Sequence, residues 1–105
     1  HALHEGIDFP AELGTPVIAS ASGKVIEAGT HPQYGKIVAI DHGNGLVSRY
    51  AHASEVFVNE GDLVVRGQKV AAVGSTGRST GPHLHFEVRM NGVPQNPARF
   101  LRSPG

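Results

Sequence analysis

Short runs of apolar and β-branched residues alternate with turn-forming residues along nearly the whole chain, and this pattern limits the possible folds more than any other feature. Fourteen glycines and seven prolines, together with many Val and Ile, favour a turn-rich β protein. No segment shows a convincing helical pattern over three turns. The predicted strands cover residues 15–19, 24–28, 36–41, 46–52, 63–65, 69–73 and 83–90. The sequence therefore predicts an all-β fold of antiparallel sheets, barrel-like or sandwich-like.

Two turns and one long loop connect the later strands. Residues 41–45, Asp-His-Gly-Asn-Gly, are typical of a hairpin connection. Asn91-Gly92 predicts a two-residue turn after the strand at 83–90, and Pro94 and Pro97 predict an irregular tail beyond it. Residues 74–82 form a long loop of Gly, Ser and Thr that leads into the same strand.

Composition and charge exclude several classes of partner. Nine basic and nine acidic side chains give a formal net charge of zero, and no basic cluster marks a nucleic-acid surface. No apolar stretch approaches the length of a membrane span. The chain has no Cys, so a bound metal would have to be held by His and carboxylate side chains. At 105 residues the chain is long enough for one domain.

The run His83-Leu84-His85-Phe86-Glu87 carries the clearest chemical signal. Successive side chains of a strand point to opposite faces, so His83, His85 and Glu87 share one face, while Leu84 and Phe86 share the other. Two imidazoles on a rigid strand indicate a metal site or a proton-transfer pair. The alternative is a solvated strand face. Glu87 is expected either to orient an imidazole or to pair with Arg89.

Two further segments supply polar groups. Residues 4–8 read His-Glu-Gly-Ile-Asp, which lacks the second His of the helical zinc-protease motif, and Gly6 disfavours a helix. We expect a loop that places His4 and Asp8 around one ion; the alternative is an exposed His and an Asp in a turn. His52 follows Tyr50 by two residues and is expected on the same face of the strand at 46–52.

Together these residues complete a hydrolytic set. Zinc in a hydrolase usually has three protein ligands and one position open for water. His4, Asp8 and one of His83 and His85 would satisfy this count, which leaves His52 and the other strand histidine for acid–base work. The remaining histidines are interpreted as surface or terminal residues without a role: His31, His42 and His1.

Motifs in sequence order then extend over nearly the whole chain. They are residues 4–9 (HEGIDF), 14–17 (GTPV), 43–45 (GNG), 50–52 (YAH), 61–62 (GD), 65–68 (VRGQ) and 74–87 (GSTGRSTGPHLHFE). This pattern resembles the lysostaphin-type, LytM-like zinc metallopeptidases, and its last stretch is highly specific. The resemblance implies a barrel-sandwich hybrid, like the duplicated hybrid motif, with long loops framing a narrow cleft. It implies zinc bound by His4, Asp8 and His85, and it assigns His83 and His52 to catalysis.

The expected function is therefore zinc-dependent endopeptidase activity on bacterial peptidoglycan, at stem-peptide cross-links or at a bridge. By this resemblance His83 would take the proton of the metal-bound water. His52 would hydrogen-bond the developing oxyanion or orient the water, and an exchange of the two roles stays open. The loop at 74–82 is expected to form one wall of the cleft, the alternative being a flexible connector.

The same resemblance gives expectations for the whole protein. Residues 1–105 are expected to be a single LytM-like peptidase domain, excised from a longer protein with further domains. The family's usual segment before the first zinc ligand, which contributes a strand and part of the groove, is expected to be missing. The location implied is periplasmic or extracellular, in the cell envelope.

Two other classes of function stay open. One is a non-catalytic module of the same fold that activates cell-wall amidases. The other is a biotinyl, lipoyl or histidine phosphocarrier, because residues 61–70 resemble the hammerhead fold of such carriers. A carrier lysine is expected in a tight hairpin, commonly between methionines, whereas Met90 is the chain's single methionine.

Overall fold

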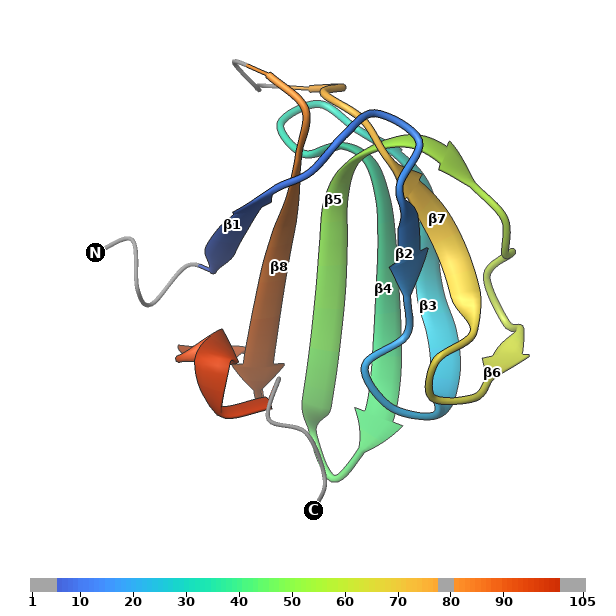
Figure 1. Cartoon of the computed structure of the whole chain (residues 1–105). Helices are drawn as coiled ribbons and strands as arrows, with labels where there is room; N and C mark the ends of the chain where they lie inside the picture. The colour runs from blue at the N-terminus through green and yellow to red at the C-terminus, as the bar shows by residue number, and fades with distance from the viewer. Residues whose placement is uncertain (1–5, 78–80, 101–105) are drawn as a thin grey trace.

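The computed structural model of the protein describes residues 6–77 and 81–100, which form antiparallel strands in two layers (Figure 1). The strands are β1 (Ile7–Pro10), β2 (Pro16–Ile18), β3 (Gly23–His31), β4 (Gly35–Gly43), β5 (Leu46–Val56), β6 (Leu63–Val64), β7 (Lys69–Val73), β8 (His83–Met90) and β9 (Val93–Gln95). A short 3-10 helix, η1 (Pro97–Phe100), follows β9. No helix in this described part is long and apolar enough to cross a membrane.

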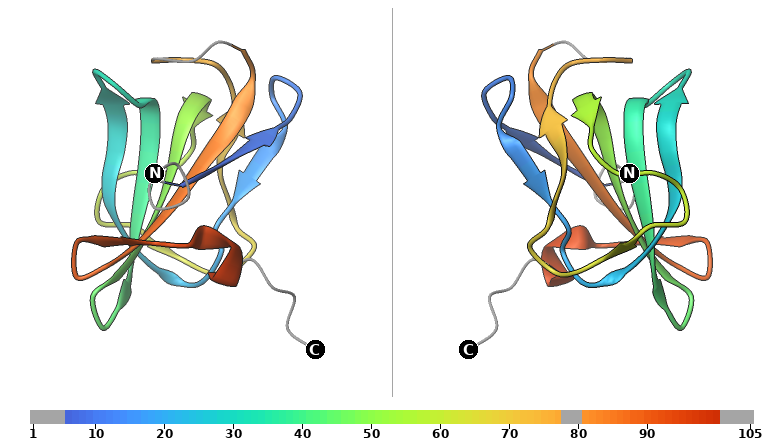
Figure 2. Two further views of the ribbon diagram at one scale, coloured as in Figure 1. Left: turned by 90° about the vertical axis from the view of Figure 1, so that its left-hand side faces the viewer. Right: turned by 90° about the vertical axis from the view of Figure 1, so that its right-hand side faces the viewer.

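The sheet order is β1-β8-β5-β4-β3-β6, and every pairing is antiparallel. The eleven-residue strand β5 joins the two layers, because its first part pairs with β4 and β8 and its last residues pair with β7. Strand β7 also pairs with β2. In the side views of Figure 2, β1 and β2 lie on one side of the molecule, and β3 and β4 lie on the other. The predicted all-β antiparallel fold is confirmed.

The hydrophobic core lies between the β2–β7 pair and the inner face of the larger layer. Val17 and Val70 come from the first pair, and Val25, Ile40 and Phe86 come from the larger layer; all five are buried. In β4, Val38 and Ile40 face this core at every second position, as expected for a strand packed on one face. The outer face of β8 is therefore left for polar side chains.

Two local predictions need correction. The strand predicted at 46–52 continues to Val56, because its end pairs with β7. The tail beyond Asn91-Gly92 is not irregular at first, since β9 pairs with β8 as an edge strand. Pro94 lacks a backbone N–H, which an edge strand tolerates. Both turn residues have positive φ, 51° at Asn91 and 82° at Gly92, which a tight hairpin requires.

Candidate functional site

Strand β8 separates polar from apolar side chains as the sequence predicts. Phe86 is 1% exposed and packs on Tyr50 in the core, with ring centroids 5.3 Å apart. On the other face, the side chains of His83 and His85 are 19% and 18% exposed. A strand anchored by a buried aromatic residue holds the imidazoles of the opposite face in fixed directions.

Asp8 lies beside these histidines in a strand, whereas the sequence predicts a loop. Strand β1 pairs with β8, so that Asp8 stands opposite His85. The carboxylate oxygen Oδ1 of Asp8 is 2.7 Å from Nδ1 of His85 and 3.5 Å from Nε2 of His83. Ile7 and Phe9 point to the other face and are half-buried. Four residues are too short a run for this alternation to be recognised in the sequence.

His52 reaches the same cluster through a β-bulge, on the face opposite to the one predicted. The register of β5 against β4 shifts beside Ile37, and His52 has a positive φ of 61°. The extra residue turns its side chain away from the core face of Tyr50. Its ring lies 5.0 Å from that of His83 and 5.9 Å from that of His85, centroid to centroid.

Backbone carbonyls orient the imidazoles of His52 and His83. Nδ1 of His52 lies 2.7 Å from the carbonyl oxygen of Thr76, and Nδ1 of His83 lies 2.8 Å from that of Gly81. A carbonyl only accepts, so Nδ1 carries a proton in both rings, and Nε2 is the nitrogen left to face the cluster. Burial lowers the pKa of His52, and the neighbouring His83 and His85 lower it further, against the carbonyl of Thr76. His52 is therefore a neutral proton acceptor at pH 7.

His85 lies between two carboxylates. Its Nδ1 contacts Asp8, and its Nε2 is 2.8 Å from Oε2 of Glu87, which is 3% exposed. The hydrogen bond with Glu87 is the main cause that raises the pKa of His85, with a further contribution from Asp8. For Glu87, burial favours the neutral acid, but hydrogen bonds from His85 and Tyr34 and the charge of Arg89 outweigh it and lower its pKa.

The described donors are of the kind that zinc binds. Imidazole nitrogen and carboxylate oxygen are common zinc ligands, and a ligating histidine usually donates its other N–H to a carboxylate. His85 has this pattern, with Asp8 at Nδ1 and Glu87 at Nε2. His4 lies outside the described residues. Within residues 6–77 and 81–100, no group of three His, Asp or Glu side chains is placed to hold a metal ion. Of the three ligands that the resemblance implies, Asp8 and His85 are among these described residues.

Sequence reasoning missed Tyr34, whose ring stacks on His85 at 6.0 Å between centroids and 22° between planes. Burial and the Glu87 carboxylate raise the pKa of its hydroxyl. His31, predicted as a surface residue without a role, is half-buried and stabilises the turn between β3 and β4. Its Nδ1 accepts hydrogen bonds from the backbone N–H groups of Gln33 and Tyr34. No local sequence pattern around Tyr34 indicates this contact.

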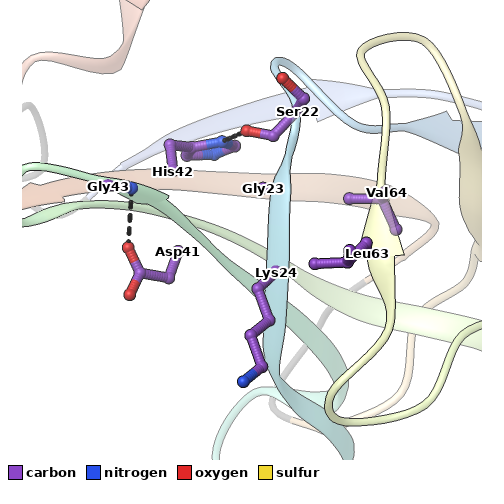
Figure 3. A pocket seen from close by; sticks show the side chains of 8 residues that line it. All are labelled: Ser22, Gly23, Lys24, Asp41, His42, Gly43, Leu63 and Val64. Carbon is purple, nitrogen blue, oxygen red and sulfur yellow. Dashed lines mark hydrogen bonds between the residues drawn. The ribbon is translucent and has the colours of Figure 1, made fainter.

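His42, also predicted at the surface without a role, is half-buried at the opposite end of the sandwich. Its Nε2 lies 2.6 Å from Oγ of Ser48, which donates to the hydroxyl of Tyr50. A hollow of about 460 Å³ opens beside it, and Figure 3 shows His42 in contact with the carbonyl of Ser22 along its rim. Neither His52 nor the β8 histidines line this hollow.

Comparison with known proteins identifies the family. The family model described as "Peptidase family M23" matches residues 2–97. The chain belongs to peptidase family M23. This M23 domain is 46% identical over 95 residues to the peptidoglycan DD-endopeptidase ShyA of Vibrio cholerae, over 90% of this chain and 22% of that protein.

Solved structures agree with this assignment. The catalytic domain of the antimicrobial peptidase lysostaphin from Staphylococcus simulans matches with a TM-score of 0.88 at 40% identity, over 95% of this chain and 80% of that chain. A zinc-containing peptidase from Vibrio cholerae matches with a TM-score of 0.86 at 42% identity, over 96% of this chain and 30% of that one. The predicted resemblance to lysostaphin-type peptidases is confirmed, and the relatives' names agree with the expected class of function.

Proposed function

We propose that this M23 domain is a zinc-dependent endopeptidase that hydrolyses peptide bonds of bacterial peptidoglycan. The observation that carries the proposal is the cluster of Asp8, His52, His83 and His85, which three separate segments bring to one site. Asp8 and His85, together with His4, are proposed as the zinc ligands, and His83 and His52 as the catalytic residues. Support comes from the family, from a relative named a peptidoglycan DD-endopeptidase and from a structural neighbour described as zinc-containing.

The proposed roles use Nε2 of His83 and of His52, because a backbone carbonyl holds Nδ1 of each ring. A bound zinc ion supplies a Lewis acid and lowers the pKa of its water towards about 7. Nε2 of His83, with the ring held at Nδ1 by Gly81, takes the proton of the attacking water. Nε2 of His52 would orient this water as an acceptor, and the proton taken by His83 would pass to the leaving amine. If His52 took the water proton in place of His83, its protonated Nε2 would donate to the oxyanion. An exchange of these two roles is compatible with the same geometry.

The setting of the domain is also part of the proposal. The chain spans 22% of the length of ShyA, so we place residues 1–105 as one peptidase domain within a longer protein with further domains. The proposed location is the periplasm or the extracellular side of the cell envelope, where peptidoglycan is found. One M23 relative, from Pseudomonas aeruginosa, is named a lipoprotein homolog, which is consistent with an envelope location.

The decisive experiment is digestion of purified peptidoglycan by the zinc-loaded domain, with the products identified by mass. We expect released peptides whose masses correspond to hydrolysis of one amide bond. His83→Ala is expected to retain zinc and lose turnover, whereas His85→Ala is expected to lose zinc. Glu55→Ala, at an exposed site on the part of β5 that pairs with β7, is the control and should match the parent.

Two outcomes would count against the proposal. Full activity of His83→Ala would remove the assignment of the base. A zinc-loaded domain that cleaves no wall material would replace the enzyme with a non-catalytic module that acts on cell-wall amidases.

A further inference from the structure

Glu87 is a buried carboxylate that the proposed reaction does not use. It is 3% exposed, and an ionised group so far from water needs close partners. Both of its oxygens have them. Oε2 is 2.8 Å from Nε2 of His85, while Oε1 is 3.1 Å from Nη2 and 3.3 Å from Nε of Arg89. The carboxylate is thus fixed by Arg89 on one side and presents its other oxygen to His85.

The two carboxylates at His85 differ in exposure. The side chain of Asp8 is 64% exposed on an edge strand, whereas that of Glu87 is 4% exposed. An ionised carboxylate only accepts, so the buried contact keeps a proton on Nε2. Nδ1, which faces Asp8, is then the nitrogen that would be available to hold a metal.

The ring of His85 is restrained from two more directions. Tyr34 stacks on its face, and Gly6 passes so close that a Cβ there would lie 2.8 Å from Cε1 of His85 and 2.9 Å from Cγ of Glu87. These neighbours limit rotation of the imidazole. With the ring fixed, what still varies is which ring nitrogen of His85 keeps its proton. The hydrogen bond with Glu87 favours the proton on Nε2.

We propose that Glu87, held in place by Arg89, is a positioning residue that directs Nδ1 of His85 towards Asp8 and thereby sets the affinity of the metal site. This inference rests on the proposed zinc site and adds the group that tunes it. Partners of this kind typically contribute 10- to 100-fold to metal affinity. Arg89 acts through Glu87, because it donates two hydrogen bonds to Oε1 of Glu87, which hold the carboxylate in place.

Substitutions at Glu87 separate its charge from its shape. Glu87→Gln keeps the size and an acceptor oxygen but removes the charge, so zinc affinity should fall about 10-fold. Glu87→Ala removes the acceptor and leaves Nε2 of His85 without this partner, so the loss should approach about 100-fold. Glu55→Gln changes an exposed carboxylate on the part of β5 that pairs with β7 and should leave the affinity unchanged.

The test is zinc affinity, measured by competition with a chromogenic chelator on the whole chain and its variants. Thermal unfolding of each zinc-free variant checks that it folds, and the near-isosteric Glu87→Gln keeps the test valid if the alanine variant does not. In nitrogen NMR of the zinc-loaded parent, we expect a proton on Nε2 of His85 and none on Nδ1. Glu87→Gln and Glu87→Ala that fold and bind zinc within about threefold of the parent, or the opposite tautomer, would overturn the inference.

These readouts distinguish the inference from the proposed function. A parent that binds zinc and leaves peptidoglycan intact would refute the peptidase activity, while a loss of zinc affinity at Glu87 would still support the positioning role. If the parent cleaves peptidoglycan and both Glu87 variants bind zinc with unchanged affinity, the positioning role is refuted and the peptidase activity is supported. A parent without zinc affinity would overturn both.

Discussion

Replacing Gly35 with alanine is expected to damage the support of His52 from a distance. Gly35 begins β4, is buried, and has a positive φ of 67°. A Cβ at this position would overlap the backbone of Thr76 and lie 2.5 Å from its carbonyl oxygen. That oxygen accepts the hydrogen bond from Nδ1 of His52. Because the obstacle is backbone, no side-chain rotation relieves the overlap.

The expected loss of stability has two parts. A non-glycine residue in the left-handed region costs about 1–2 kcal/mol. Displacing a packed neighbour costs about 1–3 kcal/mol more. The sum is about 2–5 kcal/mol, and in a domain of this size each kcal/mol lowers Tm by about 4–8 °C. We therefore expect Gly35→Ala to lower Tm by at least about 8 °C.

Two other glycines separate these contributions in thermal unfolding experiments. Gly14 has a φ of 88°, but no atom lies within 4 Å of the place that an added methyl group would take, so Gly14→Ala should show the backbone strain alone. Gly29 has neither a positive φ nor a close neighbour, and Gly29→Ala should be as stable as the parent. A Tm for Gly35→Ala within about 2 °C of that of Gly14→Ala would refute the reasoning, because the overlap with Thr76 would then contribute nothing.

Three further predictions address the core, the pH response and the metal. Tyr50→Phe removes the hydroxyl that accepts from Oγ of Ser48 and from the backbone N–H of Ser20, so urea denaturation should show a loss of about 1–3 kcal/mol, and an unchanged midpoint would contradict this. Burial keeps the pKa of His52 below 6.5, so its stabilising contribution in the zinc-free protein is present above pH 6.5 and is lost as the pH falls through the lowered pKa. In denaturant titrations between about pH 7 and 5, the free energy of unfolding of zinc-free His52→Gln should therefore fall less than that of the parent. Equal decreases would contradict this contribution of His52. Zinc at about 100 times its dissociation constant should stabilise the fold by about 2.7 kcal/mol, a gain that a chelator reverses, and a Tm indifferent to zinc would exclude a native-state site.

The parts of the site that the sequence predicts are those set by local periodicity. Alternation along residues 83–90 places His83, His85 and Glu87 on one face because the side-chain direction of a strand depends on position alone. The predicted turns at 41–45 and 91–92 follow from glycine and asparagine in left-handed conformations.

The remaining features depend on pairing between distant strands, which local pattern does not encode. The bulge that turns His52 to the site arises where β5 leaves β8 and begins to pair with β7. Asp8 is in a strand because β8 offers an edge, although its own four residues carry little signal. Tyr34 reaches His85 through a turn, so neither residue's neighbours in sequence reveal the contact.

The contact of Asp8 with His85 joins residues 77 positions apart. An ion held by both would tie the first described strand to one near the end of the chain, and it would act as a reversible cross-link that closes most of the chain into one loop. Such a closure restricts the unfolded ensemble more than a local clip does. A bound ion would thus require that β1 and β8 are paired. It would also hinder separation of β1 from the sheet, and this protection would end when the ion dissociates.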